Sequence, residues 1–253
     1  MRIATWNVNS LKVRLPHVLD WLATNQPDVL CLQEIKQEDS QHSLAQLQQI
    51  GYQAVFSGQK TYNGVAIICK SVPEDVTYGM PNFPDAQKRL IAATLNGVRA
   101  VCIYVPNGQS LDSEKYQYKL AWLKALQQWL KAELERYPKL VLLGDFNIAP
   151  VDRDVHDPLL WAGNVLVSEP ERAAFRALEQ LGLRDSFRLF EQTEKSYTWW
   201  DYRMMAFRRN MGLRIDHILI SDALQCSACS IDRAPRKLER PSDHAPVVAV
   251  TAG

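Results

Sequence analysis

Short apolar runs are spread along the whole chain, and they limit the folds that it can adopt. The strand-like runs lie at residues 2–6, 29–33, 53–56, 64–69, 89–95, 99–105, 139–143, 215–220 and 245–250. Between these runs lie segments with apolar residues at helical spacing. They follow Ser10 and cover residues 112–137 and 171–181. Neither a Gly/Ser/Pro-rich linker nor a repeat divides the 253 residues. We therefore expect a single α/β domain over residues 1–253, in which two β-layers are flanked by helices.

Charge and targeting signals restrict the partners and the compartment. Lys and Arg number 29 and Asp and Glu 28, so the net charge of +1 rules out nucleic-acid binding by bulk charge alone. No apolar run approaches the ~20 residues that span a bilayer, and the first residues lack the apolar core of a signal peptide. Cys31, Cys69 and Cys102 lie inside apolar runs, which is typical of free thiols in a reducing compartment. These features predict a cytoplasmic protein with no membrane partner.

Acidic and amide residues fall at the ends of the strand-like runs. A strand end holds a side chain in a fixed place, because the backbone behind it belongs to a rigid sheet. Oxygen ligands from several separated segments suit a hard cation such as Mg²⁺, and the shortage of soft ligands argues against zinc. The residues at these positions are Asn7, Glu34, Asp145, Asn147, Asp216, Asp243 and His244.

Two of these segments also have a simpler structural explanation. In LVLLGDFNIAP at residues 140–150, Asp145 and Asn147 share one face if extended, but Gly, Asp and Asn also form turns. In RPSDHAP at residues 240–246, His244 is either a general acid–base group or a loop residue at a strand end. Asp216 lies in an apolar run, where a carboxylate needs a metal or a partner such as His244. Taken one at a time, the turn and the loop explanations are favoured.

Eight short motifs follow one another along nearly the whole chain: WNVNSL, LCLQEIK, YNGVAI, YVPNG, SEKYQYKLAWL, GDFNIAP, TWWDYR…GLRID and SDHAP. Together and in this order they resemble the exonuclease III family of abasic-site endonucleases, within the deoxyribonuclease I-like endonuclease/exonuclease/phosphatase superfamily. The resemblance implies a four-layered α/β sandwich, which is two packed mixed β-sheets flanked by helices. It also implies an active site at one edge of the two sheets.

The metal site is implied by the resemblance. Glu34 is then the principal Mg²⁺ ligand, Asn7 supports it, and Asp243 is a further ligand or a neighbour of the ligands. Mn²⁺ is the expected substitute for Mg²⁺. Asn9, an expected DNA contact, occupies a position where some relatives carry Asp, so one negative charge is missing and the number of metal ions stays open.

The catalytic groups are implied in the same way. Asp145 is expected to orient or deprotonate the attacking water, and Asn147 to hydrogen-bond that water or the scissile phosphate. His244, oriented by Asp216, is expected to bind the phosphate and to offset the charge that builds on its oxygens. The implied reaction is an in-line attack of water on a phosphodiester, which leaves a 3′-hydroxyl.

The resemblance also implies contacts to DNA. Tyr104 and Asn107 are expected to contact the phosphate, and Trp199 and Trp200 to form a pocket for a deoxyribose without its base. The alternative for the two tryptophans is burial in the core. A charge run usually forms a solvated face, but beside such a pocket basic residues are expected to grip phosphates. The candidates are Arg203, Arg208, Arg209 and Arg214, together with Lys88, Arg89, Lys115 and Lys119.

The sequence thus predicts a Mg²⁺-dependent DNA repair nuclease that cleaves 5′ of abasic sites, with 3′–5′ exonuclease and 3′-phosphodiesterase activity. The expected partner is double-stranded DNA with abasic or 3′-blocked sites, bound by a monomer that associates with the nucleoid through DNA. The segment at residues 151–172 is expected to form a loop at the mouth of the site, with His156 and Trp161 as braces or DNA contacts.

Two alternatives remain at this point. One keeps the metal-dependent phosphoesterase core but gives it an inositol phosphate or a lipid headgroup as substrate. The tryptophan pair at residues 199–200 and the basic residues after it favour DNA instead. The other is a non-catalytic DNA-binding module, which is disfavoured because every acidic and amide position that the chemistry requires is occupied.

Overall fold

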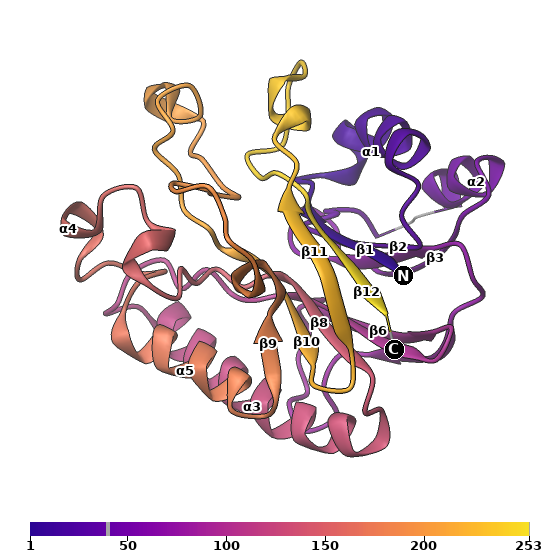
Figure 1. Ribbon diagram of the computed structural model, residues 1–253, viewed down its shortest axis with the longest axis horizontal. Coiled ribbons are helices and arrows are strands. Elements are labelled where there is room, and N and C mark those ends of the chain that lie inside the picture. The colour runs from indigo at the N-terminus through magenta and orange to yellow at the C-terminus, as the bar shows by residue number, and fades with distance from the viewer. Residues whose placement is uncertain (39–40, 253) are drawn as a thin grey trace.

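The strands of the protein form two sheets that pack face to face (Figure 1). The computed structural model describes residues 1–38 and 41–252, and within them each sheet has six strands. In spatial order the first sheet contains β11 (Gln225–Ile231), β12 (Val247–Ala252), β1 (Arg2–Asn7), β2 (Val29–Gln33), β4 (Val65–Cys69) and β3 (Gln53–Ser57). The second sheet contains β5 (Glu74–Tyr78), β6 (Leu90–Leu95), β7 (Val98–Tyr104), β8 (Leu140–Asp145), β10 (Asp216–Ser221) and β9 (Leu183–Asp185).

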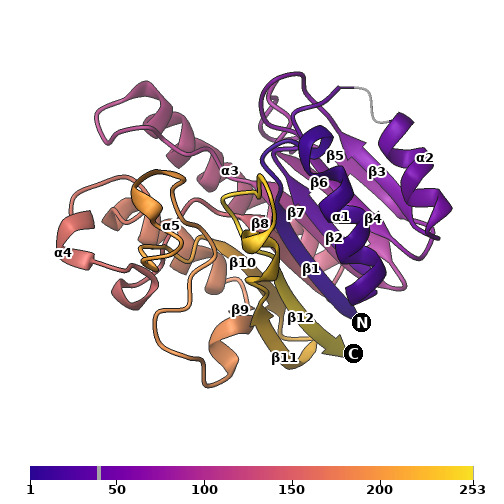
Figure 2. The ribbon, with the colours of Figure 1, turned by 90° about the horizontal axis from the view of Figure 1, so that it is seen from above.

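Both sheets are mixed. The pairs β1–β2 and β7–β8 are parallel, whereas the other strand pairs of the described residues are antiparallel. The last strand, β12, pairs with the first, so both ends of the chain lie at one side of the first sheet (Figure 2). Met1 and Thr251 exchange backbone hydrogen bonds there.

A core of alternating side chains fills the space between the sheets. Successive residues of a strand point to opposite faces, so every second residue enters this core. The other residues of the central strands face the helices, and this burial on both faces explains why those strands read as continuous apolar runs. Members of the shared core include Ile3, Val29, Cys31 and Ile67 from the first sheet and Ile91, Cys102, Val141 and Ile218 from the second.

Helices cover the outer face of each sheet. Side chains of α1 (Leu11–Asn25) and α2 (Gln41–Gln49) pack on the first sheet. Side chains of α3 (Glu114–Arg136) and α5 (Glu169–Glu179) pack on the second. Figure 1 shows these two helices below the second sheet. The result is the four-layered α/β sandwich that the sequence predicted. The remaining short helical turns are α4 (Pro158–Trp161), η1 (Asp152–Asp154), η2 (Ser186–Leu189), η3 (Arg203–Met205) and η4 (Ala234–Lys237).

Local sequence sets the bounds of the long helices. Ser113 caps α3 by accepting a hydrogen bond from the Tyr116 amide, and Pro138 follows the end of the helix. Ser168 and Glu171 form a capping box at the start of α5. No helix in the described ranges is long and apolar enough to cross a membrane.

Strand register brings the predicted polar residues to one edge. Asp216, the first residue of β10, pairs with Asp145, the last residue of β8. A Cβ on Gly144 would lie 1.9 Å from the carbonyl oxygen of Ile103, so β7 and β8 approach each other closely only because residue 144 is glycine. In the first sheet, Asn7 pairs with Gln33, the residue before Glu34.

Candidate active site

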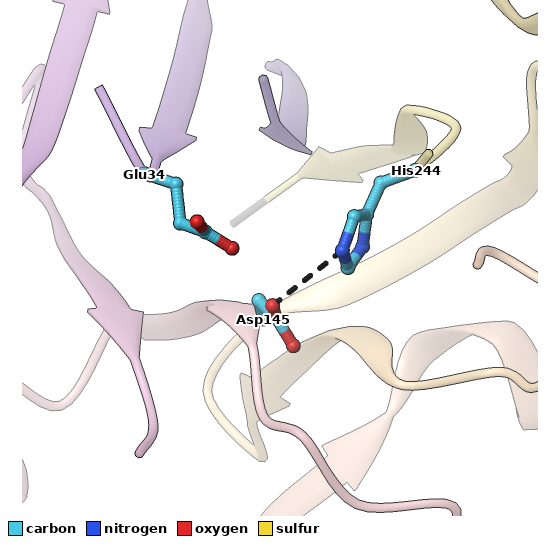
Figure 3. A group of neighbouring side chains, drawn as sticks. All are labelled: Glu34, Asp145 and His244. Atoms are coloured by element: carbon cyan, nitrogen blue, oxygen red, sulfur yellow. Dashed lines mark ion pairs between the residues drawn. The ribbon is translucent and has the colours of Figure 1, made fainter. Parts of the chain in front are cut away.

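Three ionisable side chains from separated segments meet at this edge. Glu34 follows β2, Asp145 ends β8 and His244 precedes β12, and one ligand atom from each lies within 4.8 Å of the others. Figure 3 shows the Glu34 carboxylate and the His244 ring pointing toward Asp145 from two sides. Asp145 and His244 are buried, whereas Glu34 is partly exposed. The structure therefore brings together three residues that the sequence singled out.

Asn7 connects the two carboxylates. Its Nδ2 donates hydrogen bonds of 2.9 Å to Glu34 Oε1 and of 2.9 Å to Asp145 Oδ2. The other oxygen of Glu34 lies 2.9 Å from the ammonium of Lys36. The sequence predicts no role for Lys36, and its position in LCLQEIK is the only signal that points to it. Asn7 thus fixes the separation between a carboxylate of the first sheet and one of the second.

His244 lies between two carboxylates. Its Nδ1 is 2.8 Å from Asp216 Oδ2, and its Nε2 is 3.8 Å from Asp145 Oδ2. Burial alone would lower the pKa of His244, but Asp216 and Asp145 outweigh it and raise the pKa to about 10. The ring is therefore an imidazolium at neutral pH, and its Nδ1–H donates to Asp216.

The negative charge at the site exceeds what His244 balances. Burial, together with the charge of Asp216, raises the pKa of Asp145 to about 7. Asp216 Oδ1 is buried and has no hydrogen-bond partner within the described residues. A divalent cation beside Glu34 and Asp145 would offset this excess, and oxygen donors are the ligands that Mg²⁺ and similar hard cations prefer. The residues present therefore fit a divalent metal ion.

Two amide side chains border Asp145. The backbone amide of Asn147 donates to Asp145 Oδ1 at 2.9 Å, and Asn147 Nδ2 donates to the carbonyl of Val105 at 2.9 Å. Asn107 Nδ2 donates to Asn147 Oδ1 at 3.3 Å. Because Asn107 is exposed and Asn147 buried, the pair runs from the protein interior to the surface of the site.

Tyr104 and Arg89 lie on the other side of Asn107. The Arg89 guanidinium stacks on the Tyr104 ring at 4.7 Å and donates to the Tyr104 carbonyl at 3.2 Å. Burial, with the nearby carboxylates of Glu34 and Asp145, raises the pKa of the Tyr104 phenol, so it remains a hydrogen-bond donor at neutral pH. Arg89, Tyr104 and Asn107 line a cavity of about 720 Å³ that extends away from the carboxylates.

Asp243 and Asn9 bond each other beside this group, and Asp243 lines the same cavity as Glu34, Asp145 and His244. Asp243 Oδ1 accepts from Asn9 Nδ2 at 3.0 Å, and Asp243 Oδ2 accepts from the indole of Trp199 at 3.0 Å. Asn9 Oδ1 accepts from Lys36 at 2.6 Å. Both oxygens of Asp243 are therefore engaged by protein groups, and Asp243 lies outside the group formed by Glu34, Asp145 and His244.

A cavity of about 340 Å³ opens beside this group and has one apolar wall. Trp161, Val165, Leu166 and Trp199 form the wall, and Trp161 meets Trp199 edge-on at 6.4 Å between ring centroids. Val165 and Leu166 were not identified from the sequence, because they belong to a loop and carry no polar signal. The 151–172 segment therefore contributes a wall of the site.

The expectation for Trp200 is corrected. Its side chain is 0% exposed, and its indole donates to Asn210 Oδ1 at 3.1 Å. The ring packs edge-on against Phe207 at 5.0 Å. Of the tryptophan pair, Trp199 lines the cavity and Trp200 is a core residue, which was the alternative reading of the sequence.

The basic residues divide into two groups. Arg203 lines the cavity, and Arg208 and Arg209 are exposed on the same loop. Arg214 is instead buried and pairs with Asp154 and Asp185, and Lys119 is buried and pairs with Glu171. These two cannot contact DNA, which corrects the expectation. Their acidic partners are distant in sequence, so no local charge pattern indicates that these two side chains are buried.

Comparison with known proteins places the chain among phosphoesterases. The Endonuclease/Exonuclease/phosphatase family model matches residues 4–244. Exodeoxyribonuclease III of Haemophilus influenzae is 37% identical over 265 residues, covering 98% of this chain and 99% of that protein.

Two solved structures share the fold over their whole length. The 3′ phosphatase NExo from Neisseria, bound to a product DNA hairpin, is 51% identical with a TM-score of 0.98, and each chain is covered over 100%. An AP endonuclease from Archaeoglobus fulgidus is 43% identical with a TM-score of 0.96 and the same coverage. The chain therefore belongs to the Endonuclease/Exonuclease/phosphatase family, within the exonuclease III group that its motifs predicted.

Proposed function

We propose that the protein is a Mg²⁺-dependent DNA repair nuclease that hydrolyses the phosphodiester 5′ of abasic sites in duplex DNA, with 3′–5′ exonuclease and 3′-phosphodiesterase activity. The observation that carries the proposal is the group of Glu34, Asp145 and the His244–Asp216 pair beside an aromatic-walled cavity. Relatives named as an exodeoxyribonuclease, a 3′ phosphatase and an AP endonuclease support DNA as the substrate. No relative reported above is named for an inositol phosphate or a lipid, so the alternative substrate loses support.

Asp145 acts on the attacking water in this proposal. Its pKa of about 7 is close to neutral, where a carboxylate accepts a proton most effectively during a reaction. The Asn147 amide and Asn7 Nδ2 each hold one of its oxygens, so the carboxylate is fixed in orientation. Positioning of this kind raises the rate because the water and the base meet in one geometry.

His244 binds the phosphate as a cation. Asp216 holds Nδ1, which leaves Nε2–H directed toward the space between Asp145 and Glu34. A preformed donor there stabilises the charge that develops on the phosphoryl oxygens. Tyr104, Asn107 and Arg89 extend the set of donors along the cavity wall, and the exposed Arg208 and Arg209, with Asn9, are the further DNA contacts that we propose.

We propose Mg²⁺ as the cation, with Mn²⁺ as a substitute. Glu34 would hold it, and Asn7 and Asp243 would act around it. When bound, the ion supplies positive charge against the phosphoryl oxygens. Lys36 and Asn7 orient the Glu34 carboxylate for this purpose.

The apolar wall accounts for selection of a base-free sugar. Trp199 and Trp161 line a cavity of about 340 Å³, which suits a compact sugar better than a full nucleotide. We further propose that residues 1–253 form one catalytic domain, and the core shared by the two sheets supports this. We propose that this domain acts as a monomer in the cytoplasm and associates with the nucleoid through DNA.

The experiment uses duplex DNA with one tetrahydrofuran abasic analogue, incubated with the protein and Mg²⁺ and, separately, with EDTA. We expect incision immediately 5′ of the lesion with Mg²⁺ and none with EDTA. A second duplex with a blocked 3′ end measures the 3′ activities, and an inositol phosphate serves as the control substrate. Absence of Mg²⁺-dependent incision at the analogue would contradict the proposal.

A further inference from the structure

A fully buried ion pair lies behind the active site. Lys119 belongs to α3 and Glu171 to α5, and both side chains are 0% exposed. Taking two charges out of water is costly, and a well-packed apolar pair at such a place is often equally stable. Stability alone therefore does not explain why a charged pair is buried here, and the contacts of the two side chains do.

The ammonium of Lys119 joins two loops of the active site. It donates to the backbone carbonyl of Asn147 at 2.7 Å and to that of Asn107 at 3.1 Å, and it also donates to Glu171. An ammonium has three donors, so all of them are used. Asn107 and Asn147 are the two amides whose side chains bond each other beside Asp145.

Glu171 holds a third segment of the site. Its Oε1 accepts from the backbone amide of Leu166 at 2.9 Å, and its Oε2 accepts from that of Ser168 at 3.1 Å. Leu166 belongs to the apolar wall of the cavity and has a φ of +78°, a conformation that residues with a side chain avoid. The Glu171 carboxylate therefore supports a backbone conformation that is costly on its own.

The packing and the charge of Lys119 also connect it to the active site. A Cβ on Gly108 would lie 3.2 Å from Lys119 Cδ, so the loop that carries Asn107 rests on the stem of Lys119. Burial lowers the pKa of Lys119, and Glu171 and then Asp145 act against this change. The charge of Lys119 is thus felt by the carboxylate at the centre of the site, although neither member of the pair lines the cavity.

We propose that Lys119 and Glu171 are positioning residues, which set the places of Asn107, Asn147 and Leu166 relative to Asp145. The inference rests on the proposed function, because it takes Asn107 and Asn147 as phosphate contacts. Removal of the pair then costs rate through misplaced groups rather than through lost substrate binding. A displacement of about 1 Å lowers a rate by about 10²-fold.

The test compares two buried ion pairs. The variant Lys119→Met/Glu171→Gln removes both charges at once, so no buried charge is left without a partner. The matched control is Arg99→Met/Glu133→Gln, which removes the buried pair between β7 and α3, at 2.9 Å and away from the cavity. On abasic duplex we expect kcat of the first variant to fall by about 10²-fold with KM changed by less than about threefold, while the control keeps kcat within about twofold.

Hydrogen exchange provides a readout that does not depend on catalysis. We expect faster amide exchange at residues 105–109, 146–149 and 164–168 in the first variant and unchanged exchange there in the control. Equal losses of kcat in both variants, or unchanged exchange in these segments, would overturn the inference. If the double variant fails to fold, Lys119→Arg/Glu171→Asp, which keeps both charges but changes the reach of both side chains, is measured in the same way. If wild-type protein fails to incise abasic DNA, the proposed function fails, while the exchange result still decides the positioning role.

Discussion

Asp145 is the carboxylate at the centre of the site, and burial raises its pKa to about 7. It is buried, it faces Asp216 and Glu34, and it keeps hydrogen bonds from Asn7 and from the Asn147 amide. Asp145→Asn preserves the shape and removes the proton acceptor. We expect kcat on abasic duplex to fall by about 10²–10⁴-fold, since this is the usual contribution of a general base. DNA binding, measured by fluorescence anisotropy in EDTA, should remain close to that of the wild type. Loss of binding together with turnover would instead indicate a structural role.

The two adjacent tryptophans should respond differently to the same change. Trp199 lines the cavity, so Trp199→Ala should lower the preference for abasic over intact duplex by at least about tenfold in kcat/KM. Trp200 is wholly buried, so Trp200→Ala should lower the free energy of unfolding by about 3–5 kcal/mol. Steady-state kinetics and urea denaturation on both variants separate the two effects. Equal loss of stability in the two variants would contradict this division.

His217 makes stability depend on pH. Burial, with the charge of Arg214, lowers its pKa to about 4, so the ring is neutral in the folded protein at neutral pH. The unfolded chain binds this proton below pH 6.5 and the folded protein only below about 4. Folding stability from this group is therefore present above pH 6.5 and is lost as the pH falls to about 4. The loss amounts to about 3 kcal/mol at 1.36 kcal/mol per pKa unit. His217→Gln should lose less stability over this interval in denaturant titrations, and parallel curves would refute the assignment.

Single residues were predictable from sequence where their role depends on position along a strand. Asn7, Asp145 and Asp216 lie at strand ends, so the ends of neighbouring strands bring them together. The buried partners of Arg214 and Lys119 were not predictable, because each ion pair joins residues far apart in the chain. The sequence of a basic run does not show which of its members face water and which pair with a distant carboxylate.

At the scale of elements, apolar strands were predicted well, including the edge strand β3 at residues 53–56, whereas polar edge strands were predicted poorly. The range 29–33 matches β2, and 64–69 differs from β4 by one residue. The edge strands β5, β9 and β11 were missed, since β5 and β11 are largely exposed and polar and β9 is three residues long. Helix α2 was missed because its polar sequence buries only Ser43 and Leu47 among its residues. A strand buried on both faces has an apolar run in its sequence, whereas a polar and exposed edge strand does not.

The close approach of β7 and β8 gives a prediction at this scale. Gly144→Ala would place a Cβ 1.9 Å from the Ile103 carbonyl oxygen, so the parallel pair must separate where Asp145 leaves the sheet. Gly97→Ala is the matched control, because Gly97 also has a positive φ but its Cβ would meet nothing within 4 Å. The control should cost about 1 kcal/mol in unfolding free energy from its backbone conformation alone. Gly144→Ala should cost clearly more in the same urea titration, and equal costs would count against the steric argument.

At the scale of the whole molecule, the carboxylates of the site come from both sheets. Glu34 follows a strand of the first sheet and Asp145 ends a strand of the second, so the net charge of +1 conceals a local excess of carboxylates. Sequence alone predicted the sandwich and the carboxylates, but not the fact that Asn7 bonds across the two sheets. That contact depends on how the sheets pack, which no local pattern encodes.

A cation bound between the two sheets should stabilise the whole fold, because global unfolding destroys its site. At a concentration of about ten times Kd, a ligand that binds only the folded state adds about 1.4 kcal/mol. We expect Mg²⁺ or Mn²⁺ to raise the melting temperature of wild-type protein above that in Na⁺ at equal ionic strength. Glu34→Gln keeps an acceptor for Asn7 but removes the charge, so the rise should be lost. Glu171→Gln is not a suitable control, since its loop borders the site, whereas Glu133→Gln lies away from it and should retain the rise. If the cation stabilises Glu34→Gln as much as wild type, the ion binds elsewhere and Glu34 is not its ligand.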